Sequence, residues 1–251
     1  MLTTVAFRTF EQRRHRPGSA YVWQLPITRY LQEFGKIDFR RPVTFFAGEN
    51  GAGKSTLLEA IALSAGFSGR GGPLQPEEVR GTNTESELSH WLTLRFDETL
   101  LRGYYLRNET HFDLLRDEAT RAAGRNNLAR GVDLMKRSHG ESVFDVLGEY
   151  VDGRGLYLMD EPEAGLSVIR QMALLAEIDQ AVQRGAQFLI ATHSPILLGT
   201  PGAQILQFDD FGAQDVAYRD TDAYRATQEF IEAPEAVAEF LTRPELDEED
   251  N

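Results

Sequence analysis

The sequence is organised around a glycine-rich stretch, Gly48-Glu49-Asn50-Gly51-Ala52-Gly53-Lys54-Ser55-Thr56. The apolar residues 42–47 before it predict a short buried strand, and residues 57–63 after it predict a helix. Strand, glycine loop and helix together match G-x-x-x-x-G-K-[ST], the pattern of the phosphate-binding P-loop. The alternative is a glycine-rich turn that binds no ligand, and both flanking elements argue against it.

Each residue type in this stretch suits a bound phosphate. Glycine keeps side chains out of the way of backbone N–H groups that point inward around an anion. The helix that follows directs its positive end at the same charge. Lys54 adds a mobile cation for the outer phosphates, and the Ser55 hydroxyl suits Mg²⁺. The residues predicted to bind the nucleotide here are Gly48, Asn50, Gly51, Ala52, Gly53, Lys54, Ser55 and Thr56.

Length and composition exclude several classes of protein. A chain of 251 residues corresponds to one large domain or two small ones. It has no cysteine, so a disulfide framework and a thiolate metal site are both excluded. No apolar run approaches the length of a membrane span, and the N-terminus lacks the apolar core of a signal peptide. We therefore expect a soluble, cytoplasmic protein with no direct membrane insertion.

Charge is distributed unevenly along the chain. The net charge of −13 argues against a protein that coats DNA uniformly. Residues 1–41 nevertheless carry eight Arg and Lys against three Asp and Glu, whereas residues 220–251 carry eleven acidic residues against two Arg. Both segments are explained by solvated surface. The sharper alternative is a basic N-terminal face that meets nucleic acid or an acidic partner.

Strand-like and helix-like segments alternate along the chain, which predicts the α/β class with a sheet at its centre. The predicted strands are 5–7, 20–23, 37–39, 42–47, 91–96, 103–107, 156–159, 187–192, 203–208 and 216–218. The predicted helices are 27–34, 57–63, 111–137, 142–151, 168–183, 222–231 and 234–241. The acidic tail at the end of the chain predicts a disordered segment.

A second motif ends the apolar strand 156–159 with two adjacent carboxylates, Asp160 and Glu161. Ligands of open α/β sheets bind at the carboxyl ends of the strands, so these side chains are expected beside the P-loop. In a P-loop protein the first carboxylate, Asp160, would hold Mg²⁺ together with Ser55. The second, Glu161, would orient or deprotonate the attacking water. Two exposed acids at a strand end are the alternative.

Two further motifs are ambiguous when each is taken alone. Ser138-His139-Gly140-Glu141-Ser142 lies at the start of a predicted helix and could be an ordinary helix cap. Ala191-Thr192-His193-Ser194-Pro195 follows a predicted strand. His193 could hydrogen-bond a γ-phosphate and act in catalysis, or it could be a structural histidine.

In their order and spacing, the four motifs resemble the ABC-type ATPases. Ser138 precedes Asp160 by 22 residues, and Asp160 precedes His193 by 33. The resemblance covers roughly 37–219 and is closest to small stand-alone bacterial ATPases often labelled "AAA family ATPase". The RecF and structural-maintenance-of-chromosomes ATPases are similar at a greater distance. The resemblance implies a single ATPase domain over 1–243, with a mixed sheet core, an N-terminal β subdomain, a helical signature lobe over about 108–150, and a disordered tail over 244–251.

The resemblance also implies a mechanism that uses ATP and Mg²⁺. Two copies would close head to tail over two ATP molecules as a homodimer, so that Ser138, Gly140 and Glu141 of one copy face the P-loop, Asp160, Glu161 and His193 of the other. Lys54, Glu161 and His193 would be catalytic. The implied function is a soluble ATPase that couples hydrolysis to a partner protein or nucleic acid. Two alternatives stay open, a nucleotide-binding subunit of a membrane transporter and a regulatory switch that hydrolyses little ATP.

Some positions depart from the family pattern. Ser167 stands where the interface loop 163–167 usually ends in Asp, and His139 and Glu141 replace the common Gly and Gln of transporters. Gln75 follows the P-loop too soon for the usual glutamine loop, so Asn108 and Glu109 are the better candidates. The aromatic residue that would stack on adenine stays open among Tyr21, Trp23, Tyr30 and Phe39.

Overall fold

A seven-stranded sheet forms the centre of the protein, with the strand order β10-β9-β3-β8-β7-β6-β4. The computed structural model describes residues 1–8, 21–74, 86–100, 102–107, 110 and 139–242. The strands are β3 (Val43–Gly48), β4 (Gly72–Pro73), β6 (Gly103–Arg107), β7 (Gly155–Asp160), β8 (Ala186–Ala191), β9 (Gln204–Asp209) and β10 (Gly212–Asp215). The five inner strands are parallel, whereas β10 and β4 pair antiparallel at the edges. The predicted mixed α/β sheet is therefore confirmed.

A small antiparallel sheet, in the order β2-β1-β5, forms the N-terminal β subdomain. Its strands are β1 (Leu2–Phe7), β2 (Lys36–Asp38) and β5 (Leu92–Phe96), so one of them comes from beyond the P-loop. The Gln187 side chain ties this sheet to the large one: its Oε1 accepts from the Leu2 N–H at 2.7 Å and its Nε2 donates to the Leu2 carbonyl at 2.8 Å. These bonds satisfy a buried amide and fix the two sheets together.

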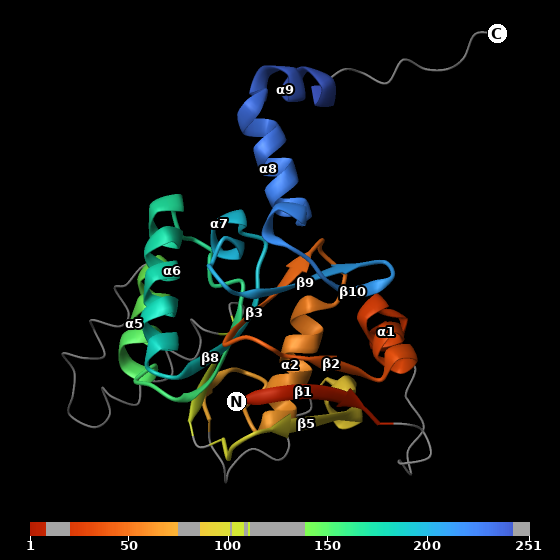
Figure 1. Ribbon diagram of the computed structural model, residues 1–251, viewed down its shortest axis with the longest axis vertical. Coiled ribbons are helices and arrows are strands. Elements are labelled where there is room, and N and C mark those ends of the chain that lie inside the picture. The colour runs from red at the N-terminus through yellow and green to blue at the C-terminus, as the bar shows by residue number, and fades with distance from the viewer. Residues whose placement is uncertain (9–20, 75–85, 101, 108–109, 111–138, 243–251) are drawn as a thin grey trace.

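Two apolar cores cover the two faces of the large sheet, because alternate residues of each strand point to opposite sides. On one face, Phe46 and Leu158 pack with α2 (Lys54–Ala65), α1 (Pro26–Phe34) and the small sheet. On the other face, Phe45 and Tyr157 pack with α5, α6 and α7. The helices of the second face are α5 (His139–Tyr150), α6 (Val168–Gln183) and α7 (Pro195–Leu198). Figure 1 shows α5 and α6 together on one side of the sheet, with α2 and the small sheet below it.

Short helical turns and a pair of terminal helices complete the described chain. The 3₁₀ turns are η2 (Tyr21–Gln24), η3 (Glu87–Trp91) and η4 (Tyr218–Asp220), and the chain continues into α8 (Asp222–Glu232) and α9 (Pro234–Thr242). Within the described ranges, no helix is both long and apolar enough to cross a membrane. The predicted helix 111–137 and the predicted tail 244–251 lie outside the described residues.

Two predicted strands are wrong. Residues 20–23 were expected to be extended, but η2 begins at Tyr21 because the Trp23 ring packs edge-on against Phe7 and Trp91 and its Nε1 donates to Glu87 Oε2 at 3.1 Å. Residues 216–218 are not a strand either, since the hairpin partner of β9 is β10, four residues earlier. There the chain turns into η4, and the Tyr218 hydroxyl donates to the Pro195 carbonyl at 3.0 Å.

The carboxyl ends of the parallel strands meet at one edge of the large sheet. Arg107, Asp160 and Ala191 lie in register on β6, β7 and β8. Next to β8, β3 ends at Gly48 and leads into the P-loop. Only β8 separates the P-loop strand from the strand of the paired carboxylates, so the predicted motifs are brought to a common edge.

Candidate nucleotide-binding site

The P-loop joins β3 to α2 through glycines that no other residue could replace without strain. Gly48 has φ +125° and Gly53 has φ +97°, values that side chains with a Cβ rarely adopt. A Cβ on Gly48 would lie 2.1 Å from the Phe208 carbonyl oxygen, and one on Gly53 would lie 2.5 Å from Ile27 Cγ2. The loop therefore packs directly against its own scaffold and holds a fixed shape.

We expect Gly48→Ala to lower the free energy of unfolding of the nucleotide-free protein by at least about 2 kcal/mol, because φ strain adds to a clash with backbone. Gly51→Ala is the matched control, since Gly51 also has positive φ (+85°) but nothing lies within 4 Å of its added Cβ. That variant should lose only about 1 kcal/mol. Urea denaturation measures both values. Equal losses for the two variants would show that the contact with Phe208 is relaxed without cost.

Lys54 begins α2 and turns its side chain back across the loop. Its Nζ donates to the Gly48 carbonyl at 2.7 Å and to the Glu49 carbonyl at 2.9 Å. The side chain is 4% exposed. Burial lowers the pKa of Lys54, and the carboxylates of Glu161 and Asp160 act in the opposite direction. The loop therefore holds a cation in a desolvated position, where attraction to an anion is strong.

Ser55 and Asp160 meet across the gap between α2 and β7. The Ser55 hydroxyl donates to Asp160 Oδ1 at 2.8 Å, although the two residues are 105 positions apart. Asp160 is 9% exposed. A hydroxyl and a carboxylate are both hard oxygen ligands, and Mg²⁺ in phosphate-transfer sites takes few protein ligands besides the substrate phosphates. This donor pair fits Mg²⁺.

Glu161 follows Asp160 at the point where the chain leaves the sheet. Its φ is +48°, and its backbone N–H donates to the Ala191 carbonyl at 2.9 Å. A non-glycine residue in this region is strained, and such strain often occurs at functional sites. His193 faces it, with Nε2 3.6 Å from Glu161 Oε1. That nitrogen is buried and has no hydrogen-bond partner among the described residues, so it remains able to bond a ligand.

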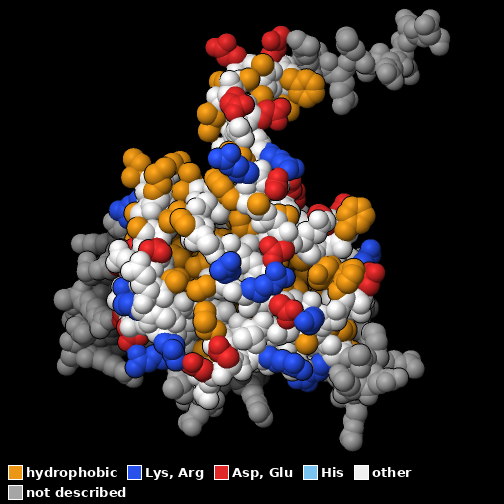
Figure 2. Space-filling view, in the orientation of Figure 1, with side chains coloured by type: hydrophobic (Ala, Val, Ile, Leu, Met, Phe, Trp, Pro, Cys, Tyr) orange, Lys and Arg blue, Asp and Glu red, His pale blue; other side chains and the backbone are white. Residues whose placement is uncertain are grey.

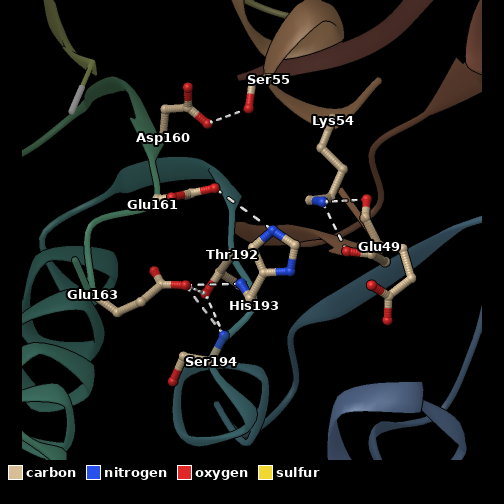
Figure 3. A network of polar contacts seen from close by, with 10 residues as sticks. Glu49, Lys54, Ser55, Asp160, Glu161, Glu163, Thr192, His193 and Ser194 are labelled. Carbon is tan, nitrogen blue, oxygen red and sulfur yellow. Dashed lines mark hydrogen bonds and ion pairs between the residues drawn. The ribbon is translucent and has the colours of Figure 1, made fainter. Parts of the chain in front are cut away.

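Figure 3 shows Lys54, Ser55, Asp160, Glu161 and His193 converging on one region from α2 and from the ends of β7 and β8. In the sequence, Lys54 precedes Asp160 by 106 residues, and His193 follows Asp160 by 33. The fold brings them together because their strands are neighbours in a parallel sheet.

Glu163 lies beside this group, and the sequence placed it only in the interface loop 163–167, with no role for its own side chain. Its Oε1 accepts three hydrogen bonds, from Thr192 Oγ1 at 2.6 Å, from the His193 N–H at 2.8 Å and from the Ser194 N–H at 3.2 Å (Figure 3). Its second oxygen, Oε2, is buried without a hydrogen-bond partner among the described residues. One carboxylate oxygen thus fixes the backbone of the His193 loop.

The same loop is tied to α6 by a second set of bonds. The Ser194 hydroxyl donates to Gln171 Oε1 at 2.6 Å, and Gln171 Nε2 donates to the Leu166 carbonyl at 3.0 Å. Ser167 caps α6, accepting from the Arg170 N–H at 3.4 Å. This capping accounts for the serine at a position where the family pattern usually has aspartate, because both residues cap helices well.

Arg107 is another residue at this edge that the motifs did not reveal. It ends β6, and its Nη1 donates to Glu59 Oε1 on α2 and to the Gly69 carbonyl, both at 3.0 Å. Both side chains of the ion pair are largely buried, at 23% and 16% exposed. The pair joins the P-loop helix to the strand next to β7. Nothing in the sequence indicated this ion pair, because Arg107 and Glu59 are 48 residues apart and neither belongs to a motif.

Other predicted site residues lie outside the described part of the chain, are described by their backbone alone, or pack elsewhere. Ser138, Gln75, Asn108 and Glu109 lie outside the described residues, while Gly140 and Glu141 fall in the first turn of α5, where the backbone alone is described. Of the candidates for adenine, Phe39 is 7% exposed and packs on Phe46, so its ring belongs to the core. Trp23 packs in the small sheet, Tyr30 stacks on Phe34 with ring centroids 4.7 Å apart, and Tyr21 is 68% exposed.

The fold and the site define a P-loop nucleotide-binding protein of the α/β class. Two family models match the chain. One, described as "AAA domain", matches residues 28–98, and the other, described as "AAA domain, putative AbiEii toxin, Type IV TA system", matches residues 133–199. The first match contains the P-loop, and the second contains the paired carboxylates and His193.

Curated relatives extend over most of the chain. The cytochrome c biogenesis ATP-binding export protein CcmA of Paracoccus denitrificans is 30% identical over 173 residues, covering 67% of this chain and 77% of that protein. CcmA of Rhizobium etli is 28% identical over 189 residues, 67% of this chain and 82% of that protein. The hemin import ATP-binding protein HmuV of Idiomarina loihiensis is 27% identical over 178 residues, 63% and 68% of the two chains.

The chain belongs to the ABC-type P-loop ATPases. A solved structure of "an inward-facing conformation of a putative metal-chelate type ABC transporter" aligns with a TM-score of 0.49 at 14% identity, covering 90% of this chain and 88% of that one.

Proposed function

We propose that the protein is a Mg²⁺-dependent ATPase whose active site is completed by a second copy of the chain in a head-to-tail dimer. The main support is that one edge of the sheet brings together Lys54, the Ser55–Asp160 pair, Glu161 and His193, in a chain that belongs to this family. The dimer would work in the cytoplasm and couple hydrolysis to a partner protein or nucleic acid.

The P-loop and its helix bind the phosphates of ATP. Backbone N–H groups of 48–56 and the N-terminus of α2 favour negative charge. Lys54 exchanges the carbonyls of Gly48 and Glu49 for phosphate oxygens, which bind an ammonium more strongly because they are charged. Ser55 and Asp160 hold Mg²⁺, which neutralises charge on the phosphates when it is bound.

Glu161 and His193 act on the γ-phosphate. Glu161 lies one residue beyond the Mg²⁺ carboxylate, so it is placed to orient a water or take its proton while remaining 41% exposed to solvent. His193 directs Nε2, a buried nitrogen without a described partner, into the same region. When protonated at that atom, it donates a hydrogen bond to a γ-phosphate oxygen and stabilises the charge that develops there.

The second copy supplies Ser138, Gly140 and Glu141. The described part of α5 starts at His139 and contains Gly140 and Glu141, and the N-terminal end of a helix is a natural site for an anion. The test is to measure phosphate release and sedimentation together. We expect turnover and dimer formation to require both ATP and Mg²⁺, and EDTA to abolish turnover. A monomer that hydrolyses ATP at full rate at every protein concentration would contradict a shared site.

A transporter subunit is the second candidate, because the relatives CcmA and HmuV are named as ATP-binding proteins of export and import systems. The two candidates differ in what the isolated chain does. The leading proposal expects ATP-dependent dimers in the absence of membranes, whereas a transporter subunit would gain most of its turnover from a membrane partner. A regulatory switch would show ATP-dependent dimers with almost no turnover.

Glu163 is proposed as a positioning residue for His193. Its Oε1 receives both the His193 and Ser194 N–H groups, so the direction of the His193 side chain depends on this one oxygen. Because the bond from Thr192 also ends there, removing the carboxylate leaves the Thr192 hydroxyl and the His193 N–H without this acceptor, while the Ser194 N–H keeps its bond to Thr192 Oγ1 at 3.0 Å. The loop would then sample other conformations and present Nε2 less often.

Glu163→Ala is expected to lower kcat by about tenfold to a hundredfold with KM for ATP nearly unchanged, because positioning of a catalytic group is lost while the P-loop stays intact. Glu163→Gln keeps an oxygen at the same reach and should retain most of the activity. Steady-state kinetics of the two variants, with thermal unfolding as a control for folding, measure the effect. If Glu163→Ala and Glu163→Gln reduce kcat equally, the hydrogen bonds from the backbone of the His193 loop to Glu163 Oε1 do not explain the loss of activity.

A further inference from the structure

The last two described helices, α8 and α9, stand away from the body of the protein (Figure 1). Neither helix contains a buried residue. We call residues 222–242 the C-terminal arm. A pair of short helices with no core of its own usually gains its stability by packing against another surface. The arm is therefore expected to pack against such a surface.

The base of the arm is anchored at the nucleotide edge of the large sheet. Thr221 is fully buried and caps α8, accepting from the Tyr224 N–H at 3.2 Å. Asp222 Oδ2 accepts from Gln207 Nε2 of β9 at 2.6 Å. α8 packs against α7, the short helix after His193, and against β3, which leads into the P-loop. The arm is therefore fixed in direction and rises from the edge that carries the site.

Large apolar side chains on the arm face solvent. Phe230 is 52% and Ile231 71% exposed on α8, and Phe240 is 75% and Leu241 73% exposed on α9. Figure 2 shows hydrophobic side chains together with acidic ones along the arm. Four large apolar residues within one exposed pair of helices mark an interaction surface more often than a solvated one.

We propose that, in the ATP-bound dimer, the arm of each copy packs against the body of the second copy. The inference rests on the proposed head-to-tail dimer, which brings the second copy onto the P-loop edge. An arm that rises from that edge would lie beside the incoming copy. Two arms contribute eight apolar side chains at roughly 100 Å² each, so they add on the order of 800 Å², about half of a standard interface.

Charge explains why the arm meets the body and not the other arm. Residues 222–242 carry five acidic residues and one arginine, so two arms repel each other. The complementary surface exists elsewhere on the same chain, where Phe34 is 59% exposed on α1. Arg29 on the same helix and Arg41 are exposed, whereas Lys36 and Arg40 already pair with Asp38 and Asp215. A second copy thus offers both the apolar and the basic contacts that the arm lacks.

The first test uses Glu161→Gln protein, in which ATP is expected to remain bound, and measures the dimer dissociation constant by sedimentation with Mg²⁺-ATP. Adding Phe240→Ser and Leu241→Ser should weaken the dimer by at least about tenfold, since buried apolar anchors dominate interfaces. The matched control is Met172→Ser, which removes a large apolar residue 53% exposed on α6, on the opposite face of the large sheet from α1. It should leave the constant unchanged.

The second test exploits the absence of cysteine from the chain. Leu241→Cys introduces a single thiol that takes a photo-reactive maleimide. We expect ATP-dependent cross-links from this position to a second copy, located by mass spectrometry of mixed isotope-labelled protein. Cross-links confined to the same chain would overturn the proposal.

The outcomes separate the arm from the dimer itself. An ATP-dependent dimer that is as tight with the arm substitutions as without them would contradict the arm and leave the shared site standing. A Glu161→Gln protein that stays monomeric with ATP would overturn the proposed dimer first, and the arm proposal with it. Weakening by Met172→Ser to the same extent as by the arm variant would also count against the arm, because it would show a non-specific effect.

Discussion

Replacing Glu161 by glutamine is expected to lower the rate of ATP hydrolysis by about a hundredfold or more while ATP still binds, because the proposed general base is lost. The substitution keeps the shape of the side chain and removes the carboxylate that faces His193 at 3.6 Å. The P-loop, Lys54 and the Ser55–Asp160 pair are untouched, so the affinity for ATP should fall little. Since ATP hydrolysis is expected to separate the two copies of the dimer, the variant should accumulate as an ATP-bound dimer.

Single-turnover hydrolysis and sedimentation with ATP measure the two parts of this expectation. Glu33→Gln is a suitable control, because Glu33 is exposed on α1, away from the converging site residues. It should behave like the unmodified protein in both measurements. An unchanged rate of hydrolysis in the Glu161 variant would remove Glu161 from the catalytic group and leave another residue or the phosphate itself to activate the water.

Lys54→Ala should have the second large effect. We expect the affinity for ATP to fall by at least about tenfold, because a charge-assisted bond to phosphate is lost from a desolvated position. The turnover number should fall by about a further hundredfold, since charge that develops on the γ-phosphate is no longer stabilised. Isothermal titration with ATP and steady-state kinetics measure the two losses separately.

Lys36→Ala is the matched control for that variant. Lys36 is exposed on β2, pairs with Asp38 at 2.7 Å and should contribute nothing to nucleotide binding. If Lys54→Ala bound and hydrolysed ATP as the unmodified protein does, the glycine loop would be a structural turn and the assignment of the whole edge would fail.

The sequence predicted the large sheet well because its strands carry continuous apolar runs. Residues 156–159 and 188–191 are apolar on both faces, as strands covered on both sides must be. Residues 20–23 were predicted as a strand from their aromatic and β-branched content. Tertiary contacts of Trp23 with Phe7, Trp91 and Glu87 override that preference.

The site was predictable where a residue belongs to a motif and not where its role depends on a distant partner. Lys54, Asp160, Glu161 and His193 are marked by short patterns at strand ends. Glu163 was passed over as part of a loop, because its three donors lie about thirty residues further along the chain. The position of Glu163 two residues after Glu161 is evident from the sequence, but no neighbouring residue indicates which loop its side chain bonds.

In the proposed dimer, each active site takes Lys54 from one copy and Ser138 from the other. Mixing two inactive variants tests this shared site most directly. Lys54→Ala lacks the phosphate lysine, and Ser138→Arg blocks the anion site of the other half. In a mixture, half of the dimers are mixed and each contains one intact shared site, so about a quarter of the unmodified activity should return. Two variants that remain inactive when mixed, although both still fold and form ATP-dependent mixed dimers, would contradict a site shared between two chains.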